Sequence, residues 1–209
     1  MIKAYPEMNA DNTCLLVIDI INSCCHEKCE IPEWNIHFSK IRQIVPYLDT
    51  FIESYRSQIN NNIILTSTVP WQLHVLPNNI NTLYLDPKTT YYSKDQSGFA
   101  EKFYGITPKE TDLVISKNSY SAFTNSSLNT YLQENQIKYI VITGVFADGC
   151  VLASIVDGFA KGYNFVILED LIETTDVPIR QELQKSLKLF TWPIMYGQTI
   201  TSKEFLSSF

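Results

Sequence analysis

Short runs of consecutive apolar residues alternate with helical patterns along this chain, and this alternation restricts its fold more than any other feature. The apolar runs cover residues 14–18, 63–65, 112–116, 139–143 and 165–168. Runs so short and continuous are typical of strands that are buried on both faces of a sheet. Helical patterns lie between and after these runs, at residues 38–55, 126–134, 148–161 and 178–190.

This order of elements predicts right-handed βαβ units and therefore a parallel sheet. We expect one α/β domain over residues 1–209, a three-layer sandwich with helices on both faces of a mostly parallel, doubly wound sheet. Pro46 interrupts the first helical pattern, which predicts either a kink or a helix that begins near it. Residues 68–105 lack a regular pattern, and a stretch of that length usually serves function or carries short elements of its own.

The composition argues against several classes of function. Hydrophobic residues make up 45% of the chain and its formal net charge is −6. A general binder of nucleic acid or anionic membranes needs a concentrated basic face instead. The longest apolar stretches are too short to span a bilayer, and residues 1–12 lack the features of a signal peptide. Five cysteines, an odd number, favour a reducing compartment, so we expect the protein in the cytoplasm.

Ligands of parallel sheets bind outside the carboxyl ends of the strands, so the residues that end the strands are the candidates for chemistry. Asp19 and Lys117 each follow an apolar run directly, and the turn at residues 144–150 ends in Cys150. Taken singly, each residue has an ordinary structural interpretation. Asp19 would be a cap or a turn former, Lys117 a solvated charge, and Cys150 a small buried hydrophobic residue.

Together the three residues favour catalysis. Cys150 opens a predicted helix, whose N-terminal N–H groups and dipole would lower the thiol pKa and could hold an oxyanion. An Asp and a Lys from neighbouring strand ends would supply a proton acceptor and a stabilising charge. The three histidines offer no context for a Cys–His pair; they are His26, His37 and His74.

Three segments resemble the isochorismatase-like cysteine hydrolase superfamily, which includes nicotinamidases, N-carbamoylsarcosine amidohydrolases and ureide amidohydrolases. LLVIDIINS is similar to the first-strand motif of the superfamily, with Asp19 on the catalytic aspartate. VISKNSYSAFTNSSL is similar to its lysine motif, with Lys117 on the catalytic lysine. VITGVFADGCVLASIVDGFAKGYNFVILEDL carries Cys150 at the position of the nucleophile. The three segments occur in the expected order and at matching spacings.

The resemblance implies a cysteine hydrolase that cleaves a small amide or ureide C–N bond through a thioester. Asp19 would accept the thiol proton of Cys150, and Lys117 would stabilise the thiolate. Main-chain N–H groups of Phe146 and Cys150 would hold the oxyanion, next to a cis peptide bond between Val145 and Phe146. The resemblance also implies a homodimer or homotetramer. We expect a small-molecule substrate as the partner and, from the composition, neither nucleic acid nor membrane.

The sequence departs from nicotinamidases at their metal-binding Asp-x-His pair. Thr68 and Pro70 occupy those two positions, and neither is a usual ligand of Zn²⁺ or Fe²⁺. His74 is near but has no carboxylate at the right spacing. We therefore expect no metal and no cofactor. Ile21 and Ser23 replace polar residues of the first motif.

The Cys24-Cys25-His26-x-x-Cys29 cluster invites a zinc interpretation, but it lacks a second ligand pair at a suitable spacing. An exposed, oxidisable loop or a partly buried pocket wall is the better interpretation of this cluster.

Aromatic residues are concentrated near the expected mouth of the site. Core packing would account for each of them, but a pocket lined by several would suit a small planar amide or ureide. We assign substrate binding to Trp71, Tyr120 and Phe123. The other aromatic residues of this group are Tyr91, Tyr92 and Phe146.

Two other functions stay open. One is isochorismatase-type hydrolysis of a vinyl ether, which can dispense with the cysteine. The other is a non-catalytic scaffold that retains the fold, although a scaffold would have no need of Asp19, Lys117 and Cys150 together.

Overall fold

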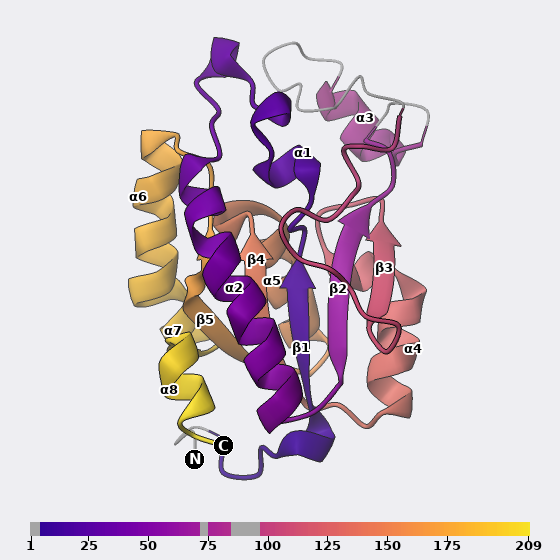
Figure 1. Ribbon diagram of the computed structural model, residues 1–209, viewed down its shortest axis with the longest axis vertical. Helices are drawn as coiled ribbons and strands as arrows, with labels where there is room; N and C mark the ends of the chain where they lie inside the picture. Colours follow the sequence, from indigo (N-terminus) through magenta and orange to yellow (C-terminus); the bar gives the residue numbers. More distant parts are fainter. Residues whose placement is uncertain (1–4, 72–74, 85–96) are drawn as a thin grey trace.

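In the computed structural model, which describes residues 5–71, 75–84 and 97–209, six strands form one sheet. The strand order is β3-β2-β1-β4-β5-β6, and every neighbouring pair is parallel. The arrows of β1, β2, β3 and β4 point the same way in Figure 1, and since all neighbouring strands are parallel, the carboxyl ends share one edge of the sheet. The strands are β1 (Thr13–Ile18), β2 (Ile63–Thr68), β3 (Leu113–Lys117), β4 (Tyr139–Val145), β5 (Asn164–Glu173) and β6 (Gly197–Ile200).

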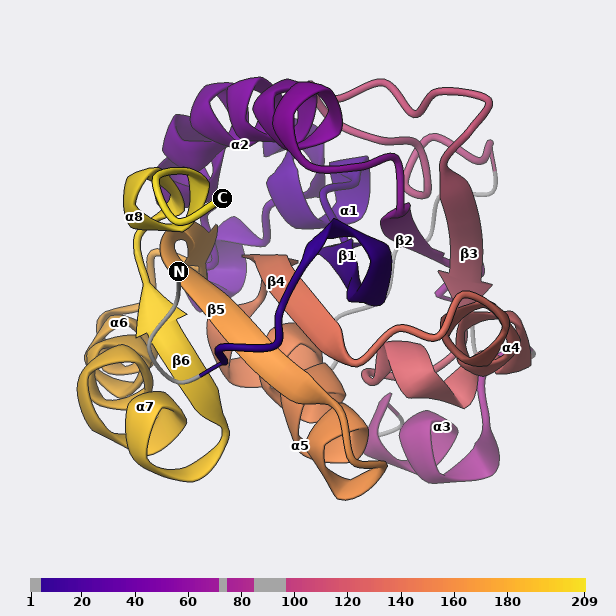
Figure 2. The same ribbon diagram turned by 90° about the horizontal axis from the view of Figure 1, so that it is seen from below.

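Helices cover both faces of this sheet (Figure 2). One face carries α2 (Ser39–Gln58) and α8 (Ser202–Leu206), and the other carries α4 (Ser126–Glu134) and α5 (Leu152–Ala160). Beside β6 lie α6 (Pro178–Ser186) and α7 (Trp192–Met195), while α1 (Asn22–Cys25) and α3 (Asn78–Tyr84) lie beyond the carboxyl ends of the strands. The predicted three-layer α/β architecture is confirmed.

The local predictions are confirmed in most places. All five predicted strands are present, but β6 was missed because its four residues are only half-buried and include two polar side chains, Gln198 and Thr199. Helix α2 begins at Ser39 and runs through Pro46, so a start near the proline is wrong. The irregular stretch contains α3, whereas residues 72–74 and 85–96 lie outside the described part of the chain.

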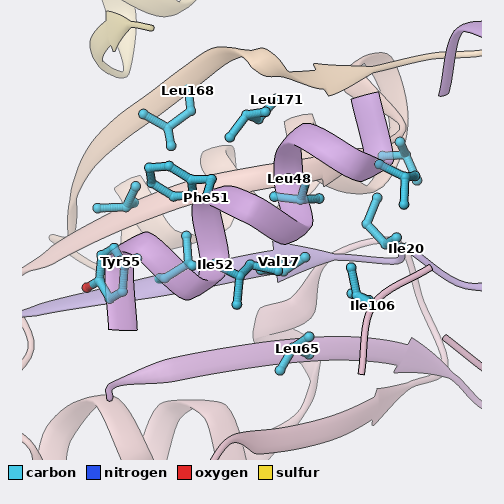
Figure 3. Packing of buried hydrophobic residues seen from close by; sticks show 14 of the residues in the cluster. Val17, Ile20, Leu48, Phe51, Ile52, Tyr55, Leu65, Ile106, Leu168 and Leu171 are labelled. Carbon is cyan, nitrogen blue, oxygen red and sulfur yellow. The ribbon is translucent and has the colours of Figure 1, made fainter. Parts of the chain in front are cut away.

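The apolar stripe of α2 packs onto the sheet (Figure 3). Leu48, Phe51 and Ile52 of the helix contribute to one hydrophobic cluster with residues of β1, β2 and β5. The full burial of Leu48 alone corresponds to roughly 2 kcal/mol of hydrophobic stabilisation. This packing fixes the sheet from which the strand ends project. None of the helices in the described ranges is long and apolar enough to cross a bilayer.

The order of the strands reverses direction between β1 and β4, which is where ligands bind in open α/β sheets. Gly144 of β4 lies against Ile18 of β1, and a Cβ at Gly144 would lie 2.1 Å from the Ile18 carbonyl oxygen. With φ at +109°, this position requires glycine. The two strand ends can therefore approach closely at the reversal point.

Candidate active site

The structure brings Asp19, Lys117 and Cys150 into direct contact, although they follow or end three different strands. Lys117 Nζ lies 2.7 Å from Asp19 Oδ2. The same ammonium group donates a hydrogen bond to Cys150 Sγ at 3.3 Å. Lys117 extends from β3 across β2 to reach Asp19, which follows β1. The rule that parallel strand ends share one edge thus accounts for all three positions.

All three protons of the Lys117 ammonium group have an acceptor. Besides Asp19 and Cys150, the backbone carbonyl of Ser119 accepts at 3.1 Å. The side chain is fully buried, and burial by itself would lower the pKa of Lys117. The adjacent Asp19 carboxylate and Cys150 sulfur outweigh that effect and raise the pKa above its ordinary value. Lys117 is therefore a fixed positive charge at neutral pH.

Asp19 is held in an unusual backbone conformation. Its φ is +50°, a left-handed value that is uncommon for a residue other than glycine. The Thr66 hydroxyl donates to Asp19 Oδ1 at 2.6 Å and accepts from the Asp19 backbone N–H at 3.0 Å. Strain of this kind persists where the surroundings enforce it. Thr66 orients Asp19 but was missed in the sequence, where its position near the end of β2 was the only signal.

The pKa of the Cys150 thiol is raised and not lowered, contrary to the expectation of a helix-terminus thiolate. Burial raises the pKa of Cys150 to about 12; Lys117 opposes the increase, and the Asp19 carboxylate adds to it. The helix does not begin at Cys150. A wide turn over Ala147–Val151 comes first, with Gly149 outside helical geometry, and α5 begins at Leu152. Asp19 and Cys150 share the Lys117 ammonium group, so a candidate proton acceptor lies beside the thiol.

This raised pKa predicts the reactivity of the thiol. Iodoacetamide should label Cys150 before Cys14, because Cys150 lines a cavity and Cys14 is fully buried in β1. The labelling rate should still rise about ten-fold per pH unit between about pH 7 and about pH 10, since the thiolate fraction does so below the pKa. Mass spectrometry of quenched samples measures it. A plateau near neutral pH would contradict the raised pKa.

The turn that carries Cys150 is closed around the Phe146 carbonyl. Gly149 N–H and Val151 N–H donate to that oxygen at 2.9 and 3.2 Å. The peptide bond between Val145 and Phe146 is cis, the arrangement that the resemblance implied. The backbone N–H groups of Phe146 and Cys150, the expected oxyanion donors, belong to this one turn.

Cys150 and Asp19 line a cavity of about 650 Å³, a size typical of small-molecule sites. Trp71 and Tyr120 also line it, with ring centroids 6.1 Å apart. Its apolar wall consists of Ile31, Phe38, Trp71, Tyr120, Phe146, Leu152, Ala153 and Val156.

Phe123 does not line the cavity, so its assignment as a substrate-binding residue is corrected. It is 5% exposed and stacks on Tyr163, with ring centroids 5.7 Å apart. Gly158 of α5 makes room for this ring, since a Cβ there would lie 2.6 Å from it. Three other residues singled out in the sequence, His74, Tyr91 and Tyr92, lie outside the described residues.

The cysteine cluster divides between the pocket wall and the core. Cys24 and Cys29 line the cavity, whereas Cys25 is fully buried. His26 instead accepts the backbone N–H of Lys28 and packs its ring edge-on against aromatic neighbours. Within residues 5–71, 75–84 and 97–209, no three Cys, His, Asp or Glu side chains are grouped so as to hold a metal ion.

An ion pair in the cavity wall was missed in the sequence. Arg180 of α6 donates from Nε and Nη2 to the two carboxylate oxygens of Asp148, at 2.6 and 2.7 Å. The two residues are 32 positions apart, and nothing in the local sequence at either position predicts the contact.

Comparisons with known proteins identify relatives of this chain. A ureidoacrylate amidohydrolase, RutB of Cronobacter sakazakii, is 35% identical over 77 residues, which are 37% of this chain and 33% of that protein. An N-carbamoylsarcosine amidase of an Arthrobacter species is 37% identical over 67 residues, 32% of this chain and 25% of that enzyme. The matched segments thus span about a third or less of the length of these relatives.

Solved structures share the fold along nearly the whole chain. A cysteine hydrolase from Pseudomonas syringae superposes with a TM-score of 0.78 at 20% identity, covering 96% of this chain and 93% of that one. An N-carbamoylsarcosine amidase from Thermoplasma acidophilum reaches 0.65 at 20% identity, covering 93% and 97%. The family model named Isochorismatase domain matches residues 13–199, a range that includes all three strand-end residues. A chain with this sheet order and this match belongs to the isochorismatase family.

Proposed function

We propose that this protein is a cysteine hydrolase that cleaves the C–N bond of a small amide or ureide, with Asp19, Lys117 and Cys150 as its catalytic triad. The observation that carries the proposal is the contact of a buried ammonium group with both a carboxylate and a thiol beside a cavity. Acyl transfer requires a nucleophile, a base and a stabilising cation, and here the cation is within hydrogen-bonding distance of the other two groups. The two relatives of similar sequence, a ureidoacrylate amidohydrolase and an N-carbamoylsarcosine amidase, support the same class.

The first half-reaction would transfer the acyl group to the enzyme. As Cys150 Sγ attacks the carbonyl carbon, Asp19 takes the thiol proton, an S–C bond forms and the carbonyl electrons move to oxygen. The N–H groups of Phe146 and Cys150 donate to that oxyanion. When the carbonyl re-forms, the C–N bond breaks and Asp19 gives the proton to the leaving nitrogen. Lys117 stabilises the negative charge on Asp19 or on the Cys150 sulfur in each of these steps.

The second half-reaction would release the product with water. Asp19 takes a proton from a water molecule as its oxygen attacks the thioester carbon. The C–S bond then breaks, and the Cys150 thiolate recovers the proton from Asp19. The sum is amide plus water giving carboxylic acid plus ammonia or amine, with the enzyme unchanged. The raised pKa of the Cys150 thiol favours this return of the proton.

Ammonia release from a panel of primary amides and ureides tests the proposed class. At least one member should be hydrolysed, and a stalled thioester should add the acyl mass to the peptide that contains Cys150. Release of pyruvate from a vinyl ether with no amide turnover would instead support the isochorismatase-type reaction. Absence of both activities would support a scaffold.

We expect hydrolysis to proceed without a metal ion. The residues at the two metal-ligand positions of nicotinamidases do not fit one: Thr68 has a hydroxyl and Pro70 has no donor side chain. Activity should survive exhaustive treatment with EDTA, and elemental analysis of active enzyme should find no stoichiometric zinc or iron. Loss of turnover on chelation that one added metal restores would contradict this.

We also propose that the chain forms a homodimer or homotetramer and acts in the cytoplasm. Exposed apolar side chains are concentrated on α5, α6, α7 and the turn between the last two, and exposure of this extent is typical of interaction surfaces. They are Val156, Phe159, Ile179, Leu183, Leu189, Phe190, Ile194 and Met195. Light scattering after size exclusion should give a mass above the 24.0 kDa of one chain. A mass of one chain at the concentration of the assay would contradict the proposed oligomer.

A further inference from the structure

The described part of the cavity wall carries more acidic than basic side chains. Three described lining residues are acidic, Asp19, Asp148 and Asp157, and one is basic, Arg180. The charge of Asp19 is neutralised by its ion pair with Lys117. A substrate that carries a carboxylate would depend on Arg180, the one cation in this described part of the wall, so the contacts of Arg180 decide which substrates fit.

Arg180 binds the turn at residues 146–151, which carries Cys150 and is called the nucleophile turn below. Its Nε and Nη2 hold both oxygens of Asp148, and Nη1 donates to the Thr175 hydroxyl at 3.1 Å. The guanidinium carbon lies 4.9 Å from the ring centroid of Phe146, a cation–π distance. Asp148 and Phe146 both belong to the segment that leads to Cys150. Arg180 therefore joins α6 to that turn at two points.

The Asp148–Arg180 pair is electrically balanced and largely shielded from water. The side chains are 8% and 18% exposed. Burial would raise the pKa of Asp148, but the bonds from Arg180 outweigh it and lower the pKa, so the carboxylate stays charged at neutral pH. The Thr174 hydroxyl also donates to Asp148 at 2.6 Å. A substrate carboxylate would have to displace Asp148 from this geometry to gain the guanidinium.

The described part of the cavity wall has a net negative charge, which disfavours an anion. The charges of Asp19 and Asp148 are balanced by Lys117 and Arg180. The exposed carboxylate of Asp157 is then the remaining charge among the described lining residues. Most of the other lining side chains are apolar or aromatic. These surfaces gain free energy by covering an apolar group and offer no compensation for a desolvated anion.

We propose that the substrate is an uncharged amide with an apolar or aromatic group, and that Arg180 is a positioning residue for the nucleophile turn and not an anchor for a substrate carboxylate. This inference rests on the proposed amide hydrolysis and narrows it to a substrate class. It also separates this chain from relatives that are named for acidic substrates, such as ureidoacrylate.

Matched pairs of amides that differ only in a carboxylate test the substrate class. Benzamide is compared with 4-carbamoylbenzoate, and hexanamide with 6-amino-6-oxohexanoate, by ammonia release. We expect kcat/KM to be at least about ten-fold higher for the neutral member, about 1.4 kcal/mol of discrimination. A preference for the acids would overturn this inference and leave amide hydrolysis intact. No turnover of any primary amide or ureide would overturn the proposed function and this inference with it.

The Arg180→Met variant tests the positioning role. We expect kcat for the preferred neutral amide to fall by about ten-fold or more while KM changes by less than about three-fold, with partial recovery of kcat in Arg180→Lys. A higher KM confined to carboxylate-bearing amides, with normal kcat for neutral ones, would overturn the positioning role.

Arg56→Met is the matched control for loss of an Arg–Asp pair. Arg56 donates to both oxygens of Asp112 at 2.8 and 3.1 Å, as Arg180 does to Asp148, but it lies on α2 and does not line the cavity. This variant should lower the unfolding midpoint and leave kcat per folded molecule unchanged. An equal fall of kcat in both variants would mean that the loss at Arg180 is only structural and would overturn the positioning role.

Discussion

Replacement of Cys150 by Ala should reduce amide hydrolysis by about 10⁴-fold or more, because the substituted chain has no atom to form the thioester. The fold should persist, since Cys150 lines the cavity and alanine adds no bulk. Turnover is measured as ammonia release at saturating substrate, and the fold by thermal unfolding. Addition of acyl mass to the protein in stalled reactions should disappear in this variant.

Cys25→Ala is the matched control for loss of a buried sulfur. Cys25 is fully buried near the site but does not line the cavity. Its replacement should cost about 1 kcal/mol of stability and leave turnover within a few-fold of wild type. If Cys150→Ala kept more than about a tenth of the activity, or if both variants lost it equally, Cys150 would not be the nucleophile.

The three strand-end residues of the candidate site could be located from the sequence because their positions depend on topology and not on side-chain detail. Asp19 and Lys117 follow or end buried apolar runs, and parallel strands bring such ends to one edge. The family resemblance then separated these residues from ordinary surface charges. The same logic predicted that residues far apart in sequence would meet at this edge, and in the structure Lys117 Nζ and Cys150 Sγ lie 3.3 Å apart.

Other features depend on three-dimensional packing that no local pattern encodes. The pKa of Cys150 follows from burial, which outweighs the nearby ammonium group, and the sequence does not report that balance. Phe123 is three positions after Tyr120, yet a short turn over Ala122–Thr124 directs its ring into the core, away from the cavity. The contact between Asp148 and Arg180 depends on how α6 is placed against the nucleophile turn.

Replacement of Lys117 by Met should affect stability and catalysis together. The methionine keeps the length and the apolar stem of the lysine, so the loss is mainly that of the charge. Asp19, 1% exposed, would then be a buried carboxylate without its cation, which typically costs about 3–5 kcal/mol. Turnover should fall by about 10³-fold, because neither Asp19 nor the Cys150 sulfur would have a stabilising cation. Denaturant unfolding and ammonia release measure the two effects.

The double variant Asp19→Asn/Lys117→Met separates the two effects. It removes both charges at once, so no unpaired charge stays buried and most of the lost stability should return. Activity should stay absent, since the base is gone as well. If the single and double variants were equally unstable, the loss would come from packing and not from an isolated carboxylate. Wild-type stability and turnover in Lys117→Met would show that the pair is not formed.

The pH dependence of the stability difference adds an independent check on the same ion pair. The pKa of Lys117 is raised in the folded protein, so its contribution is fully present below the ordinary lysine value of about 10.4 and is lost as pH rises through the raised pKa. The free energy of unfolding lost in Lys117→Met should therefore not decline as pH rises from about 6 to about 10. Labelling of Cys150 should climb steeply over much of that range. A stability difference that declined together with the increase in labelling would mean that the ammonium group loses its proton near neutral pH, and Lys117 could then not stabilise the thiolate.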